Sequence, residues 1–343
     1  MRFGLFGGAR SKGGGSAGDS LGYRTWIDYV LKAEALGFHS VFVVEHHFTG
    51  VGQVSASLSL LSYLAALTKR IRLGTAVVVL PWHNPALLAE QVATLDLLSG
   101  GRVDLGIGKG YREYEFHGFD IPQDEASARF DECRAFLRKA WTAEGRFSHG
   151  GRFWTFNDIV IEPRPVQAPH PPFWVGAGSI DSIRRAAAEG ASLLLDQIAP
   201  IDLTLHRVAV YREEQARRGI AAKPEQIAVA RALQLVRTDE ERRQAEQIRL
   251  QVLRNIGDLA RGEGADRYHA LGPGIDVSLA REDAPLLGTP DEISERLQRL
   301  QRGGVDYVLL VDPTGSMSSL EAFAAEVMPR FERPSDDAPL TRL

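Results

Sequence analysis

The feature that most constrains the fold is a regular alternation, along the whole chain, of short apolar runs with helical patterns. Runs rich in Val, Ile, Leu and Phe predict buried strands, and the stretches between them have the spacing of helices. Such alternation predicts parallel strands joined by helical crossovers. The predicted strands lie at 1–7, 39–45, 71–80, 102–108, 172–177, 191–197, 226–236 and 306–312, and the predicted helices at 22–37, 56–69, 85–98, 127–142, 180–189, 202–218, 239–256 and 290–302.

Eight strand–helix units follow one another without a linker, which favours a closed (β/α)8 TIM barrel over a doubly wound open sheet. The chain of 343 residues is long enough for such an α/β barrel with insertions. We expect a single domain over 1–335 and a C-terminal tail at 336–343. Two stretches break the alternation: the Gly- and Ser-rich segment 9–20 predicts a mobile surface loop, and 257–289 predicts an extended loop that acts as a lid.

The composition excludes several classes of protein. Lys and Arg number 40 against 44 Asp and Glu, and the net charge of −4 gives no basic surface for nucleic acid. No stretch reaches the roughly 20 apolar residues of a membrane span, and the N-terminus has too short an apolar core for a signal peptide. The only cysteine, Cys133, cannot form an internal disulfide and is predicted to be a packed thiol. We therefore expect a cytoplasmic enzyme or binding protein with neither a nucleic-acid nor a membrane partner.

The second predicted strand ends in an acid and two imidazoles, Glu45, His46 and His47. In a (β/α)8 barrel this end of a strand faces the active site. Adjacent histidines on an extended segment point in opposite directions, so they cannot easily grip one ion, and we predict no metal site. A histidine that titrates near neutrality and transfers a proton fits better. The alternative is a surface turn with solvated imidazoles.

Two more strand ends carry groups suited to an anion. The sequence GAGS at 176–179 places small residues just before a helix, whose first N–H groups attract a phosphate. The sequence GKGYR at 108–112 supplies the positive charges of Lys109 and Arg112 at a neighbouring strand end. Taken singly, each could be an ordinary turn with solvated side chains. Together they predict an enzyme site at one mouth of the barrel.

Four motifs, in the same order along the chain, resemble the bacterial luciferase family of flavin-dependent monooxygenases. They are EHHF at 45–48, GTAVVVLPWHNPALLAEQ at 74–91, SGGRVDLGIGKGYREYEFHGF at 99–119 and GTPDEI at 288–293. The first is typical of the branch that uses FMN. The resemblance covers most of the chain, from MRFGLF to the closing helix.

The resemblance implies a barrel that binds reduced FMN, supplied by a separate flavin reductase. In the family, O2 converts the reduced flavin into a C4a-peroxide, which oxidises a small organic substrate, here expected to be apolar. It also implies that His46 is catalytic, that the peptide between Ala76 and Val77 is cis, and that Lys109 contacts the flavin phosphate. The cofactor-binding residues that it implies are Glu45, His47, Ala76, Val77, Lys109, Gly110, Tyr111, Gly176, Ala177, Gly178 and Ser179.

The chain departs from light-emitting relatives at two positions. Gly108 stands where they carry a reactive cysteine, and Lys109 stands where they carry arginine. These departures argue against light emission but not against monooxygenation.

Other functions remain open on the sequence alone. A deazaflavin (F420)-dependent oxidoreductase would share the fold, although EHHF argues against it, and a non-catalytic flavin carrier would not need His46. A metal-dependent hydrolase is disfavoured because Asp and His lack the required spacing. Family members usually pair through helices of the second and third units, so we expect a homodimer. The apolar helix 55–67 suits such an interface, or simply packs against the barrel.

Overall fold

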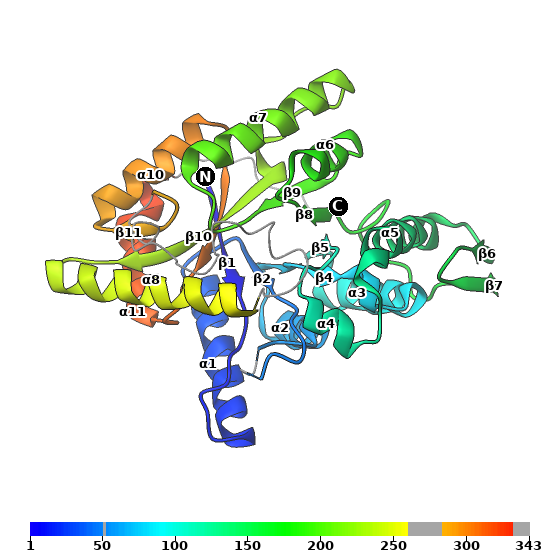
Figure 1. The fold of residues 1–343 in the computed structure, drawn as a ribbon, viewed down its shortest axis with the longest axis horizontal. Helices are drawn as coiled ribbons and strands as arrows, with labels where there is room; N and C mark the ends of the chain where they lie inside the picture. Colours follow the sequence, from blue (N-terminus) through cyan, green and yellow to red (C-terminus); the bar gives the residue numbers. More distant parts are fainter. Residues whose placement is uncertain (51–52, 260–282, 332–343) are drawn as a thin grey trace.

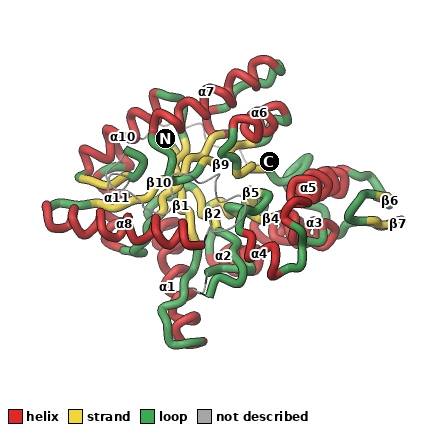
Figure 2. The backbone as a smooth tube through the Cα atoms, in the orientation of Figure 1, coloured by secondary structure: helices red, strands yellow, loops and turns green. Residues whose placement is uncertain are grey.

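The computed structural model describes residues 1–50, 53–259 and 283–331. Its centre is a barrel of parallel strands, and helices surround it on the outside (Figures 1 and 2). The eight barrel positions are occupied, in chain order, by β1 (Arg2–Gly7), β2 (Ser40–Val43), β3 (Arg72–Thr75) continued by β4 (Val78–Val79), β5 (Val103–Gly108), β8 (Phe173–Gly176), β9 (Ser192–Leu195), β10 (Ile227–Leu235) and β12 (Tyr307–Val311). The pairing of β9 with β10 closes the ring, which confirms the predicted (β/α)8 barrel.

The predicted helices are all present, close to their predicted positions. They are α1 (Ser16–Ala35), α2 (Ser57–Leu67), α3 (Pro85–Ser99), α5 (Ala126–Thr142), α6 (Ile180–Ala188), α7 (Ile201–Arg217), α8 (Asp239–Leu259) and α10 (Pro290–Arg302). A further helix, α11 (Met317–Glu326), follows the last barrel strand and was not predicted. Short elements decorate the connections: the 3-10 turn η1 (Leu80–Trp82), helix α4 (Glu113–Gly118), a hairpin of β6 (Phe147–Gly150) and β7 (Thr155–Ile159), and strand β11 (Leu286–Gly288). No helix of the described ranges is both long and apolar enough to cross a membrane.

The apolar residues form two layers, because the strands are buried on both faces. The larger layer fills the space between the barrel and its helices. The smaller one fills the barrel interior, where the rings of Phe42, Trp174 and Tyr307 meet edge to face at centroid distances of 5.7 to 6.3 Å. This packed interior leaves the strand ends as the place for a ligand.

Local signals explain the sharp helix boundaries near the site. Asn84 caps α3 by accepting hydrogen bonds from the N–H groups of Ala86 and Leu87, and Gly100 ends the helix in the left-handed region. Thr289 is the N-cap of α10, within a capping box that includes Glu292.

The prediction of a mobile loop over 9–20 was wrong in its second half. Helix α1 begins at Ser16, and the loop before it folds back on the helix. A Cβ on Gly18 would lie 1.4 Å from the carbonyl oxygen of Gly13, and one on Gly22 would lie 1.8 Å from that of Arg10. Gly18 and Gly22 are therefore required for close packing of the loop on the helix. The prediction instead interpreted the glycine-rich sequence as a segment that does not pack.

The predicted lid at 257–289 lies mostly at 260–282, outside the described residues, as does the predicted tail at 336–343. Its last part is not a loop, because β11 pairs in parallel with the end of β10.

Candidate active site

Four neighbouring barrel positions, β2, β3 with β4, β5 and β8, bring their C-terminal ends to one rim. They are hydrogen-bonded in this order and all run parallel, so the sequence motifs that follow them face the same mouth. The predicted site residues are therefore brought together. The histidine motif and the 176–179 turn lie on one side of the molecule.

Glu45, at the end of β2, is a buried hydrogen-bonding centre. Its Oε1 accepts from Nε2 of His47 at 2.9 Å and from Nε2 of His83 at 2.7 Å, and its Oε2 accepts from the N–H of Val79 at 3.0 Å. Burial by itself would raise the pKa of Glu45, but the charge of His83 and these hydrogen bonds outweigh it and lower the pKa to about 2. Both oxygens face protein groups, so Glu45 fixes the positions of His47, His83 and the Val79 backbone.

His46 points to a second carboxylate, which comes from α4. Its Nδ1 lies 3.1 Å from Oε1 of Glu115, and the same oxygen accepts from the N–H of His47 at 2.9 Å. Since a carboxylate oxygen accepts, Nδ1 carries the proton and Nε2 of the neutral ring is left as an acceptor. Burial lowers the pKa of His46 below its usual value, the bond to Glu115 opposes this, and the nearby Arg112 guanidinium lowers the pKa further.

Aromatic rings surround His47. Its imidazole meets Phe119 edge to face at 4.8 Å between centroids and Trp82 at 5.4 Å, and these two rings stack on each other at 5.3 Å. Phe116 adds a further edge-to-face contact to Trp82. The result is an apolar wall beside the imidazoles, built from η1 and α4.

The peptide between Ala76 and Val77 is cis, as predicted. Val77 lies between two glycines of the neighbouring strand ends: a Cβ on Gly108 would come within 2.4 Å of its side chain, and one on Gly176 within 3.2 Å. The missing side chains thus make room for the segment after β3. This also gives a packing reason for glycine at 108, where light-emitting relatives carry cysteine.

The small-residue turn at 176–179 leads into α6. Ser179 is the N-cap, and its Oγ accepts from the N–H of Ser182 at 3.3 Å. Gly176, Gly178 and Ser179 are exposed and Ala177 is half-buried, so the turn is open to a ligand. A Cβ on Gly178 would lie 3.7 Å from Nη2 of Arg207.

The segment after β5 is held by packing and by hydrogen bonds. Gly110 has a φ of 75°, and a Cβ there would come within 2.8 Å of Val79, so glycine is required. Lys109 donates from Nζ to Oγ of Ser127 at 3.3 Å. Tyr111 accepts at its hydroxyl from Nε of the buried Arg112 at 3.2 Å. All the predicted residues of this segment therefore lie at the mouth.

Two observations fit this mouth to a flavin. The indole N–H of Trp82, whose ring contacts His47, is buried and has no acceptor among the described residues, so it suits a ligand that brings carbonyl or ring-nitrogen acceptors. The open 176–179 turn at a helix start suits a phosphate. In the described part of the chain no group of three or more His, Cys, Asp or Glu is arranged to hold a metal ion.

Sequence reasoning missed three residues of this site. Glu115 lies in the EYEF sequence of α4, two positions from the exposed Glu113, and nothing in the local pattern separates them. Asp196 lies on the loop directly after β9, the strand next to β8. Arg207, its ion-pair partner, lies on the charged helix α7 that follows. Only the spatial neighbourhood shows their relation to the mouth.

Comparisons with known proteins agree with this geometry. The family model described as luciferase-like monooxygenase matches residues 1–307. The chain is 30% identical over 311 residues to an FMNH(2)-dependent dimethylsulfone monooxygenase of Pseudomonas putida, with 82% of each chain covered. It is 37% identical over 172 residues to an uncharacterized protein of Sinorhizobium fredii, a match that covers 50% of this chain and 49% of that one. The chain thus spans about half the length of the first curated relatives that it matches.

Solved structures share the whole fold. Monooxygenase RslO1 from Streptomyces bottropensis superposes with a TM-score of 0.82 at 26% identity, covering 97% of this chain and all of that one (100%). An F420-dependent secondary alcohol dehydrogenase superposes with a TM-score of 0.78 at 18% identity, covering 97% and 99%, which shows the fold alone. The family model matches well over half of the chain, so the chain belongs to the luciferase-like monooxygenase family.

Proposed function

We propose that the chain is the oxygenase of a flavin-dependent monooxygenase. It would take reduced FMN from a separate flavin reductase, react with O2 through a flavin C4a-peroxide, and oxidise a small apolar organic molecule. The observation that carries the proposal is the pair of His46 and Glu115 at the mouth where the cis segment and the 176–179 turn also meet. The family assignment supports the same chemistry.

The protein's own part is to hold a proton and to exclude water. His46 is neutral near pH 7 because its pKa is lowered, and its Nε2 is directed away from Glu115 as a proton acceptor or, once protonated, a donor. Glu115 fixes the ring orientation, as the carboxylate does in other histidine–carboxylate pairs. The wall of Trp82, Phe116 and Phe119 keeps this side of the mouth apolar. A bound flavin would supply the oxygen chemistry itself.

The test is an anaerobic titration with reduced FMN, followed by O2 and a panel of aldehydes, ketones and terpenes. We expect tight binding of reduced FMN and an oxygenated product from at least one compound class. The variant His46→Ala should bind FMN nearly as the wild type does and lose product formation by a factor of about 100 or more, as for removal of a general acid or base. His117→Ala, at an exposed position of the same helix as Glu115, is the matched control. Full turnover in His46→Ala would contradict the role given to His46.

An F420-dependent oxidoreductase is the second candidate, since such an enzyme shares this fold. It would transfer hydride and would consume no O2. The same titration with F420 in place of FMN separates the two, because the preferred cofactor binds at lower concentration.

We also propose that two copies pair through α2 and α3, which pack against each other. These helices expose large apolar side chains, namely Tyr63, Leu67, Leu87, Leu97 and Leu98. Exposed apolar residues gathered on adjacent helices suit an interface.

A further inference from the structure

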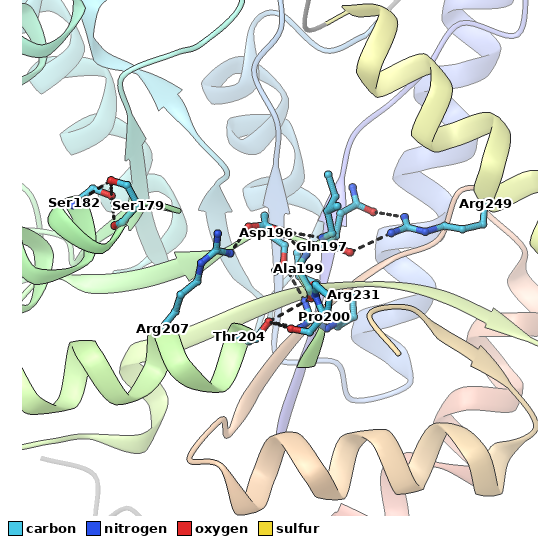
Figure 3. A network of polar contacts seen from close by, with 12 residues as sticks. Ser179, Ser182, Asp196, Gln197, Ala199, Pro200, Thr204, Arg207, Arg231 and Arg249 are labelled. Atoms are coloured by element: carbon cyan, nitrogen blue, oxygen red, sulfur yellow. Dashed lines mark hydrogen bonds and ion pairs between the residues drawn. The ribbon is translucent and has the colours of Figure 1, made fainter. Parts of the chain in front are cut away.

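Arg207 projects from α7 toward the turn that follows β8. Its Nη1 is ion-paired with Oδ2 of Asp196 at 2.8 Å, and its side chain is only 14% exposed. Its Nη2 lies 3.7 Å from the position that a Cβ on Gly178 would occupy. Within the described residues, Asp196 is its one hydrogen-bonding partner, and Nη2 is not used (Figure 3). One edge of the guanidinium is therefore fixed and the other faces the turn.

The carboxylate that holds Arg207 is itself held rigidly. Its Oδ1 accepts from the N–H groups of Ile198 and Ala199, both at 2.8 Å, and the carbonyl of Asp196 accepts from Nη1 of Arg231 at 2.9 Å. Burial alone would raise the pKa of Asp196, but the N–H of Ala199 and the charge of Arg207 outweigh it and keep the carboxyl ionised. Arg207 is thus preorganised before any ligand arrives.

Two further guanidiniums contact the Asp196–Thr204 segment. Arg231 is fully buried, donates to Oγ1 of Thr204 and has no partner at Nε among the described residues. The equally buried Arg249 donates to Gln197 (Figure 3). Burial lowers the pKa of Arg231 to about 10, so it remains charged at neutral pH. The guanidiniums of Arg207, Arg231 and Arg249 thus all contact residues 196–197 of the loop after β9. The carboxylates of Asp196 and Asp283 act on the charge of Arg231.

We propose that Arg207 is a phosphate-recognising residue of the cofactor site, with its free edge on the flavin phosphate at the 176–179 turn. The inference rests on the proposed function, because it assumes that the cofactor is a phosphorylated flavin. The resemblance assigns the phosphate to Lys109 on the β5 side of the turn. Arg207 stands on the β9 side, so the phosphate would be held from both flanks, and a guanidinium can offer two N–H groups to its oxygens.

The test compares FMN with riboflavin, which differs only in lacking the phosphate. We would measure the affinity of Arg207→Met for each by flavin fluorescence quenching, with Arg207→Lys as the variant that keeps a positive charge. Arg217→Met, on the same helix at a largely exposed position, is the matched control. Circular dichroism of each variant reports whether it folds.

We expect Arg207→Met to weaken FMN binding by about tenfold or more, the usual effect of losing a charge-assisted hydrogen bond, and to change riboflavin binding less than about twofold. Arg207→Lys should recover part of the loss, and inorganic phosphate should compete with FMN but not with riboflavin in the wild type. Unchanged FMN affinity in a folded Arg207→Met protein would overturn the inference alone, and so would equal losses for both ligands. A wild-type protein that binds neither FMN nor riboflavin, in the oxidised form or reduced under anaerobic conditions, would overturn the proposed function as well.

Discussion

Replacing Glu45 by Gln tests whether the centre of the site also stabilises the fold. The carboxylate accepts three hydrogen bonds, from His47, His83 and the N–H of Val79, and its side chain is only 1% exposed. A glutamine has the same shape but only one acceptor oxygen. If that oxygen faces the imidazoles, its NH2 meets the N–H of Val79. If the amide is reversed, both imidazoles lose their acceptor.

The magnitude follows from this geometry. In either orientation at least one buried donor is left without an acceptor, which costs about 1–3 kcal/mol, and the remaining bonds lose the charge of the acceptor, at about 1 kcal/mol. We expect Glu45→Gln to lower the free energy of unfolding by about 2–4 kcal/mol at pH 7. The loss should appear as an earlier transition in urea and a lower Tm.

The pH dependence gives a second readout. The pKa of Glu45 is lowered to about 2 in the folded protein, below the usual 4.5 that the unfolded chain would have. A lowered carboxyl pKa means that this stabilisation is complete above about 4.5 and is lost as the pH falls toward 2. The difference between wild type and Glu45→Gln should therefore stay constant from pH 7 to about 5 and shrink below that.

The control is Glu144→Gln, an exposed glutamate on a surface turn, which should change stability by less than about 0.5 kcal/mol. If Glu45→Gln unfolded within that same margin of the wild type, the three hydrogen bonds could not be the constraint described here. A difference that persisted unchanged to pH 3 would equally contradict the low pKa.

Other expectations follow from the same geometry. Replacing Glu115 by Leu should reduce the rate of product formation by about 30-fold or more. Glu115→Gln should reduce that rate only about fivefold, since an amide oxygen still accepts from His46 and from the N–H of His47. Equal losses of rate in the two variants would contradict the role of Glu115 in orienting His46. In the wild type, product formation should rise with pH through a midpoint below the usual 6.5 and be flat above it, because the lowered pKa of His46 leaves the ring neutral; a midpoint above 7 in a pH–rate profile would refute this. Leu98→Glu should shift the protein from dimer to monomer in analytical ultracentrifugation while leaving the Tm within a few degrees, and a wild-type monomer would refute the proposed pairing.

The barrel could be predicted because its strands have a recognisable sequence pattern. Strands buried on both faces are continuous apolar runs, and each observed barrel strand lies within its predicted range. The secondary-structure predictions were wrong where the side-chain pattern does not indicate how the backbone packs. The helix start at Ser16 was missed because glycines at 18 and 22 pack backbone on backbone. The hairpin of β6 and β7 was missed because its strands are short and partly exposed.

The site was predictable only in its inner layer. Glu45, His46 and the 176–179 turn lie directly at strand ends, where the topology alone places them at the mouth. Glu115 and Arg207 come from the helices that follow β5 and β9. On those helices the residue type does not distinguish a site residue from an exposed one. Glu115 belongs to the site and Glu113 is exposed, yet both are glutamates of α4.

This division has a consequence for how the site is tuned. The strand ends are tied to the barrel by close contacts such as Val77 against Gly108 and Gly176, so a change there disturbs the fold as well as the site. Glu115 and Arg207 make their contacts here through side-chain atoms, from the helices α4 and α7. A substitution at these two positions can therefore alter the protonation of His46 or the hold on an anion while the barrel is kept. Differences in chemistry between relatives that share this barrel are best sought first in the helices that follow β5 and β9.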